Sequence, residues 1–228
     1  VTIKENLNRT ILFRSQIESQ TDIPLIGELP FVKTVTSHPF VSKDDSMIFI
    51  DEIRQVAARL GLFSRFFKKK KILITSNIAG EGKSFISANL AKCLAEAGKR
   101  TLLIDIDLRN PKLTDYFGMV ENEGLVDYLN NEINLEQILQ DTHYKDLFFI
   151  PSGTKGGDYT ELLLNGRLEH LFRQAEIDFD YIIIDSAPIS MVSDVHLLAE
   201  YSEKNLIITR HNYTPKDIIM RLDDSVKL

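Results

Sequence analysis

The chain has 228 residues, of which 43% are hydrophobic and 26% are charged, and its net charge is −6 at pH 7. This length can bury the core of one large α/β domain, and the composition is ordinary for a soluble globular protein. The acidic balance argues against non-specific nucleic-acid binding. A single cysteine excludes an intrachain disulfide, and no apolar run approaches the roughly 20 residues that span a membrane. We therefore expect a soluble, cytoplasmic protein that binds no nucleic acid.

Residues 1–40 have mixed character and predict an arm that leads into the domain. Leu7, Ile11 and Ile17 fit a loose amphipathic helix in the first half of this arm, and prolines punctuate the second half. Residues 41–228 are expected to form one domain. The chain stops where an alternation of strands and helices calls for another strand, so we expect that it is truncated at its C-terminus.

Hydrophobic patterning predicts strands and helices that alternate along the domain. The expected helices cover residues 44–67, 83–94, 161–174, 192–201 and 214–222, and the expected strands cover 72–75, 101–104, 147–150, 179–184 and 206–209. Such an alternation implies an α/β fold, in which a mostly parallel sheet carries helices on both faces. Residues 68–71 are all lysine, and we favour a solvated lead-in to the first strand over a contact with an anionic membrane.

The segment SNIAGEGKS, residues 76–84, joins the first of these strands to a helix. Its glycines permit the backbone angles that turn successive N–H groups toward a phosphate, and the helix adds its positive N-terminal end. Lys83 can reach the β- and γ-phosphates of a nucleotide, and the Ser84 hydroxyl can ligate Mg²⁺. Asn77 stands where the usual G-x-x-x-x-G-K-[ST] pattern has its first glycine, so the loop is a deviant version. The residues expected to contact the nucleotide are Ala79, Gly80, Glu81, Gly82, Lys83, Ser84 and Phe85.

Acidic side chains follow two of the predicted strands. Asp105 and Asp107 stand at i and i+2 after one strand, and Asp185 ends the apolar run of another. Ligands bind at the carboxyl ends of parallel strands, where these acids can face one Mg²⁺–phosphate site. A solvated strand end explains each acid equally well when it is considered alone. Arg210 follows the last expected strand, where it either borders the nucleotide site or is a surface cation.

These segments together resemble the bacterial tyrosine kinases of the polysaccharide co-polymerase system, the BY-kinases. The matching segments are SNIAGEGKS (76–84), LLIDIDLRNPKL (102–113), YIIIDSAPISMVSD (181–194), IPLIGELP (23–30), TELL (160–163) and ITRHNYT (208–214). The resemblance covers nearly the whole chain. It implies that residues 41–228 are a P-loop kinase domain that uses ATP and Mg²⁺ to phosphorylate protein tyrosines.

The resemblance also implies roles for the site residues. Lys83 would contact the phosphates, and Asp107 and Asp185 would complete the Mg²⁺ ligands with the loop serine. Asp105 would accept the proton of the tyrosine hydroxyl. Arg109 would support the carboxylates or the transferring phosphoryl group. We expect positioning to matter more than base strength, because an unperturbed tyrosine has a pKa of about 10.

Partners and location are implied by the same resemblance. Neighbouring copies would phosphorylate one another in a homo-oligomer, and a tyrosine phosphatase would reverse the reaction. A transmembrane chain-length domain would precede this chain and hold it at the cytoplasmic side of the inner membrane, where it would steer capsule or exopolysaccharide synthesis and export.

Some residues depart from the family pattern. Asp51 and Arg54 fit the oligomerisation motif E-x-x-R-x-x-R, but Ala57 replaces its last arginine. Residues 156–159 replace the expected PPNP, and no tyrosine follows Tyr213. These departures keep open a nucleotide-binding scaffold without kinase activity.

The other alternative is an ATPase switch of the partition or cell-division type. Those ATPases carry an additional lysine early in the loop, where this chain has Ile78, and they lack an arginine equivalent to Arg109. Both features favour the kinase.

Overall fold

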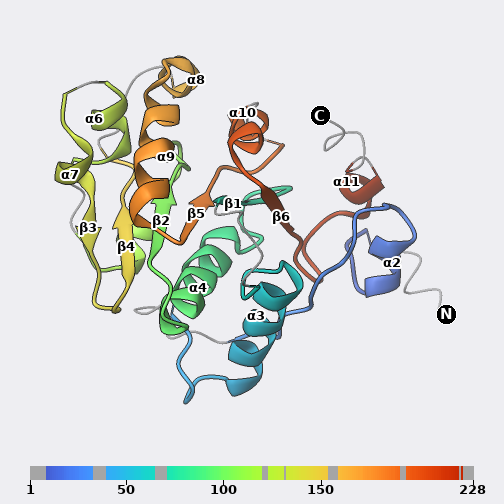
Figure 1. The fold of residues 1–228 in the computed structure, drawn as a ribbon. Helices are drawn as coiled ribbons and strands as arrows, with labels where there is room; N and C mark the ends of the chain where they lie inside the picture. Colours follow the sequence, from blue (N-terminus) through green and yellow to red (C-terminus); the bar gives the residue numbers. More distant parts are fainter. Residues whose placement is uncertain are drawn as a thin grey trace.

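The structure, a computed structural model, describes residues 9–32, 40–64, 71–119, 123–130, 132–153, 159–190, 194–220 and 222. Its centre is one six-stranded sheet in the order β3-β4-β2-β5-β1-β6 (Figure 1). The strands are β1 (Lys71–Ser76), β2 (Thr101–Asp105), β3 (Gln140–Asp141), β4 (Leu147–Ile150), β5 (Tyr181–Asp185) and β6 (Lys204–Ile208). All neighbouring strands are parallel except β3 and β4, so the predicted fold class is confirmed.

Helices cover both faces of this sheet. The helices of the described residues are α2 (Arg14–Glu18), α3 (Met47–Arg59), α4 (Lys83–Glu96), α5 (Leu113–Tyr116), α6 (Leu125–Leu129), α7 (Leu135–Ile138), α8 (Tyr159–Leu164), α9 (Arg167–Asp178), α10 (Asp194–Tyr201) and α11 (Lys216–Met220), of which α2 and α11 lie to one side of the sheet (Figure 1). Within β1, Ile72 and Ile74 belong to the core cluster of α3 and α4, and Leu73 belongs to the opposite cluster with α6, α8, α9 and α10. This alternation is the period of two that a strand imposes when both of its faces are buried.

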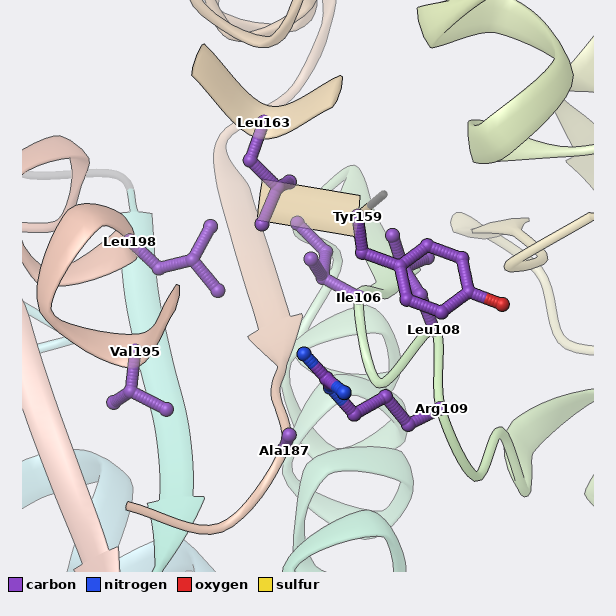
Figure 2. A pocket seen from close by; sticks show the side chains of 8 residues that line it. All are labelled: Ile106, Leu108, Arg109, Tyr159, Leu163, Ala187, Val195 and Leu198. Carbon is purple, nitrogen blue, oxygen red and sulfur yellow. The ribbon is translucent and has the colours of Figure 1, made fainter. Parts of the chain in front are cut away.

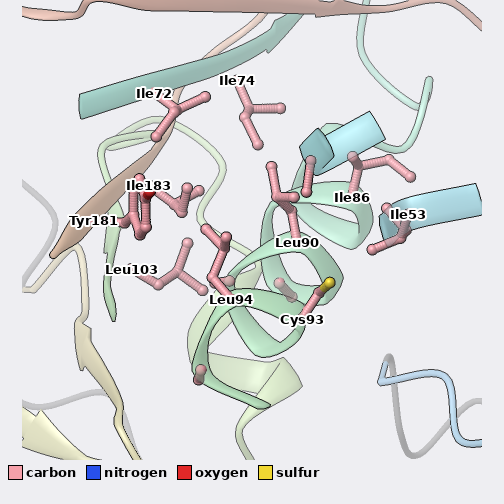
Figure 3. Packing of buried hydrophobic residues seen from close by; sticks show 14 of the residues in the cluster. Ile53, Ile72, Ile74, Ile86, Leu90, Cys93, Leu94, Leu103, Tyr181 and Ile183 are labelled. Atoms are coloured by element: carbon pink, nitrogen blue, oxygen red, sulfur yellow. The ribbon is translucent and has the colours of Figure 1, made fainter. Parts of the chain in front are cut away.

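The core under α4 fixes where this helix begins. Leu90 and Leu94 point from α4 toward Ile72, Leu103 and Ile183 of the sheet (Figure 3). All five side chains are 0–1% exposed. At roughly 25 cal/mol per Å² of apolar area, burying each such side chain contributes about 2 kcal/mol. The anchored helix therefore presents its first turn at the carboxyl end of β1.

The helix expected over residues 44–67 is shorter than predicted. Ser46 caps the start of α3 by accepting a hydrogen bond of 3.1 Å from the N–H of Phe49. The helix ends before Gly61, whose φ of 80° is left-handed, and the N–H of Leu62 returns to the carbonyl of Ala57 at 2.9 Å. The prediction missed this stop, and residues 65–67 lie outside the described part of the chain.

The single helix expected over residues 161–174 is two helices, α8 and α9. Gly166 separates them with a left-handed φ of 82°. The side chain of Asn165 accepts from the N–H of Arg167 at 2.9 Å and donates to the carbonyl of Leu129 at 2.8 Å. The break therefore comes from an asparagine and a glycine inside an otherwise helical pattern.

The arm contains a shorter helix than expected and returns to the far end of the chain. Only α2 is helical within its described residues, and residues 1–8 lie outside them. The N–H of Ile11 donates to the carbonyl of Thr214 at 2.9 Å, and the N–H of Asn212 donates to the carbonyl of Ile11 at 2.7 Å. Figure 1 accordingly shows α2 beside α11. The division of the chain at residue 40 stays a prediction.

The predicted lysine run is described only at Lys71, which begins β1; residues 68–70 lie outside the described part. Lys71 forms ion pairs with Glu176 and Glu203. Within the described residues, none of the helices combines the length and the apolar character needed to cross a bilayer.

Candidate active site

The loop between β1 and α4 has the backbone geometry of an anion-binding turn. Gly80 and Gly82 have φ values of 87° and 101°, which side-chain-bearing residues rarely adopt. The N–H of Ile86 bonds back to the carbonyl of Gly82 at 3.0 Å. The N–H groups of the three preceding residues, Lys83 to Phe85, therefore precede the first intrahelical bond and can serve a ligand. The ring of Phe85 itself packs against Phe49, with 5.3 Å between centroids, so it faces α3.

Lys83 links the loop to the acids of the neighbouring strands. Its Nζ lies 2.6 Å from Asp107 Oδ2 and 3.8 Å from Asp185 Oδ2, and it donates to Ser84 Oγ at 3.2 Å. Burial lowers the pKa of Lys83, but the charges of Asp185 and Asp107 outweigh this effect and the net shift is upward. Lys83 is therefore held as an ammonium group at the centre of the site.

Asp185 ends β5 with a fully buried side chain. Its Oδ1 accepts a hydrogen bond of 2.8 Å from the Ser87 hydroxyl, but its Oδ2 has no hydrogen-bond partner among the described residues. Burial raises the pKa of Asp185, although the charge of Lys83 opposes the rise. A buried carboxylate oxygen without a donor fits a site that takes a cation.

Asp105 is equally buried but its oxygens are engaged. They accept hydrogen bonds from the backbone N–H groups of Asp107, Lys112 and Leu113, at 3.1, 3.3 and 3.1 Å. Burial, and then the charge of Asp185, raise the pKa of Asp105 to about 8. Asp105 thus holds the turn after β2 that carries Asp107.

The predicted metal ligands Ser84, Asp107 and Asp185 gather around one ammonium group. Mg²⁺ usually takes one or two carboxylates and completes its octahedron with waters and substrate phosphates, so one hydroxyl and two carboxylates suit it. No group of three or more His, Cys, Asp or Glu side chains in the described residues could hold a metal by itself. The donor set therefore fits Mg²⁺ that arrives with a nucleotide.

Arg109 lies in the loop after β2, in an apolar surrounding, and its expected support of the carboxylates or the phosphoryl group stays a prediction. Figure 2 shows its guanidinium directed toward Ala187 in the loop after β5. It also lies 5.9 Å from the centroid of the Tyr159 ring. Arg109, Tyr159 and Ala187 border a small, mostly apolar pocket whose other lining residues are Ile106, Leu108, Leu163, Val195 and Leu198.

Arg210 contacts the phosphate loop through a backbone carbonyl, and its expected contact with the nucleotide stays a prediction. Its Nη1 donates to the carbonyl of Gly80 at 2.9 Å. Sequence reasoning missed three further site residues: Ser87, Tyr213 and Thr214. The sequence offered a signal for each of them. Ser87 stands about one helical turn after Lys83 and so shares its side of the helix, and the other two lie in the ITRHNYT segment that resembles the family.

Comparison with known proteins gives a family match and several relatives named as tyrosine-protein kinases. Residues 69–219 match the family described as the AAA domain. The chain is 31% identical over 211 residues to the tyrosine-protein kinase ptk of Acinetobacter johnsonii, covering 88% of this chain and 29% of that protein. It is 38% identical over 156 residues to the tyrosine-protein kinase CpsD of Streptococcus agalactiae serotype III, covering 65% of this chain and 67% of that protein. The chain thus spans less than a third of the first of these relatives.

Solved structures share the fold over most of the chain. The chimerical protein CapA2B2 superposes with a TM-score of 0.84 at 26% identity, covering 94% of this chain and 93% of that one. The kinase domain of the Escherichia coli tyrosine kinase ETK has the same fold, with a TM-score of 0.84, 21% identity and coverage of 95% and 91%. The septum site-determining protein MinD of Pyrococcus horikoshii, solved with Mg-ADP, shares the fold over 61% of this chain and 57% of its own, with a TM-score of 0.54 and 24% identity.

Proposed function

This chain belongs to the bacterial tyrosine-kinase family, and we propose that it is a catalytic domain that transfers the γ-phosphoryl group of ATP to protein tyrosines. The observation that carries the proposal is the position of Lys83 Nζ, 2.6 Å from Asp107 and 3.8 Å from Asp185, at the start of a helix that follows a phosphate-type loop. Loop, ammonium and two strand-end carboxylates make up the parts that phosphoryl transfer needs.

The loop would bind the phosphates of ATP through its inward N–H groups and through Lys83. Ser84, Asp107 and Asp185 would hold Mg²⁺, which offsets charge on the phosphate oxygens when it is bound. Most of the catalytic effect in such sites comes from alignment and from charges that are fixed before the reaction begins. The buried ammonium is such a charge, because its two acidic neighbours keep it protonated.

In the reaction, the tyrosine oxygen forms a bond to the γ-phosphorus while the bond from that phosphorus to the bridging oxygen of ADP breaks. The hydroxyl proton passes to Asp105 in our proposal. A pKa raised to about 8 makes Asp105 a stronger base than an ordinary carboxylate once the pH is high enough to ionise it. Its oxygens bind N–H groups of the turn after β2, so that turn must shift for the tyrosine to reach them. Arg109 would steady the acids or the phosphoryl group.

The surrounding biology is also proposed from the family. Neighbouring copies would supply the tyrosines in a homo-oligomer, and a phosphatase would remove the phosphates. A preceding transmembrane chain-length domain would keep the kinase at the cytoplasmic side of the inner membrane. The outcome would be control of capsule or exopolysaccharide synthesis and export, which agrees with relatives named for capsule loci.

The test is phosphotransfer to a tyrosine copolymer with MgATP, detected by phosphotyrosine antibody and by mass spectrometry. Wild-type protein should label the copolymer, and Lys83→Met should not. ATP hydrolysis without any phosphotyrosine would instead favour a switch of the partition type. Tight ATP binding without turnover, unchanged by Lys83→Met, would favour the scaffold.

A further inference from the structure

The phosphate loop is held on its outer side by a turn from the opposite end of the chain, residues 210–214. In a loop whose N–H groups face a phosphate, carbonyl groups are left facing outward and need donors. Tyr213 Oη donates to the carbonyl of Ala79 at 2.9 Å, and Arg210 Nη1 donates to the carbonyl of Gly80 at 2.9 Å. Two consecutive outward carbonyls are therefore satisfied by one turn.

The same turn holds the acidic residue of the loop. The Thr214 hydroxyl donates to the carboxylate of Glu81, whose other oxygen accepts from the N–H of Ile78 at 2.8 Å. Glu81 is 5% exposed and Thr214 is fully buried. Thr214 also accepts from the N–H of Arg210 at 2.8 Å, which closes the turn. Burying a carboxylate costs free energy unless its oxygens accept hydrogen bonds, so the contact with Thr214 holds Glu81, and with it this part of the loop, in place.

The fit between loop and turn is close. A Cβ added to Gly80 would lie 2.6 Å from Tyr213 Oη, so the ring hydroxyl approaches the loop where only glycine leaves room. The turn is itself anchored, because the N–H of Asn212 donates to the carbonyl of Ile11 at 2.7 Å. Asn212 has a left-handed φ of 53°. Asparagine tolerates this left-handed backbone better than most residues.

We infer that Tyr213 and Thr214 are positioning residues that keep the phosphate loop in its binding conformation before a nucleotide arrives. The inference rests on the nucleotide-binding part of the proposed function, not on phosphate transfer to tyrosine. A loop that spends less time in the competent conformation binds with an affinity reduced by that fraction. Loss of the turn's hydrogen bonds therefore weakens nucleotide binding even though neither residue belongs to the loop.

The experiment compares Thr214→Val and Tyr213→Phe with matched remote variants. Thr142→Val removes a hydroxyl that donates to the carbonyl of Leu147 at 2.8 Å, and Tyr144→Phe alters a tyrosine whose ring packs on Phe40. Both control residues precede β4, at the edge of the sheet opposite the site. MgADP affinity is measured by calorimetry, and hydrogen exchange of the amides of residues 78–83 is measured without nucleotide.

A lost hydrogen bond is worth a factor of about two to ten in an equilibrium. We expect Tyr213→Phe to weaken MgADP binding within this range and Thr214→Val to weaken it by about tenfold, because Glu81 then loses a buried donor. The loop amides should exchange faster in both variants. Thr214→Ser, which keeps the hydroxyl, should remain within about twofold of wild type.

The inference is overturned if MgADP affinity and loop exchange in Thr214→Val match those of Thr142→Val, or if Thr214→Ser fails as badly as Thr214→Val. Binding of MgADP by wild type without phosphotyrosine formation would refute the proposed kinase and leave the positioning role measurable. Failure of wild type to bind MgADP would overturn both.

Discussion

Asp105 and Asp185 lie opposite one another in the register of β2 and β5, at the last paired position of the two strands. Both carboxyl groups are fully buried, and each lies within the field of the other and of Lys83. Lys83 Nζ lies 3.8 Å from Asp185 and 2.6 Å from Asp107, so these two acids share one ammonium group. Asp105 instead accepts hydrogen bonds from the turn after β2. Burial raises the pKa of both strand-end acids, and for Asp105 the charge of Asp185 adds to the rise, while Lys83 opposes it. Burial lowers the pKa of Lys83, but the charges of Asp185 and Asp107 outweigh this effect.

Replacing Lys83 by Met should destabilise the protein in the absence of nucleotide. The change leaves Asp107 and Asp185 buried without their cation, which typically costs about 3 kcal/mol. The cost should shrink as pH is lowered, because protonated acids no longer need the ammonium group. Urea unfolding at pH 7.5 and at pH 5 measures both effects, with exposed Lys145→Met as the control. Equal stability of the two variants would contradict the shared-cation arrangement.

Asp105 should set the pH dependence of phosphotransfer. A carboxyl group whose pKa is about 8 is mostly protonated at pH 6 and can accept a proton only as the pH rises. Activity of the wild type should therefore climb about tenfold per pH unit below this value and level off above about 8. Asp105→Asn should be slower and should lose the climb, whereas exposed Asp115→Asn should keep it. An unchanged pH profile in Asp105→Asn would remove Asp105 as the proton acceptor.

Gly80→Ala separates backbone strain from contact with Tyr213. Gly98 has a similar φ of 75° but open space around it, so Gly98→Ala reports the strain of an alanine at positive φ alone. Gly80→Ala should weaken MgADP binding more than Gly98→Ala does, because the added Cβ of residue 80 meets Tyr213 Oη. Adding Tyr213→Phe should recover part of this loss, and calorimetry on wild type, the two single variants and the double variant measures the coupling. Strictly additive effects would show that loop and ring do not press on one another.

The sequence predicted the central strands well because their residues are buried on both faces. The three residues before Asp105 and before Asp185 are all apolar, and the strand ends place the two acids side by side. Helix ends were predicted less well. Gly61 ends one helix and Gly166 divides another, because each adopts a left-handed backbone, and the spacing of apolar residues carries no information about such a backbone. The two-residue strand β3 has no apolar pattern of its own.

Within the site, motif spacing located the loop and the acids but not the contacts from distant segments. Thr214 was expected to begin the last helix, but its hydroxyl donates to Glu81 and accepts from the N–H of Arg210. The distance from Glu81 to Thr214 along the chain is 133 residues, so only the folded sheet order brings them together. Arg210 also reaches the loop from a distant segment, since it donates a hydrogen bond to the carbonyl of Gly80.

The most direct test of the account is a calorimetric titration with ATP in the presence and absence of Mg²⁺, on wild type and on Asp185→Asn. We predict that Mg²⁺ strengthens ATP binding to wild type and that the variant loses this gain, since removing a residue that supports a metal typically costs about tenfold or more in metal affinity. ATP affinity that is indifferent to Mg²⁺ in wild type, or a full gain retained in Asp185→Asn, would contradict the account.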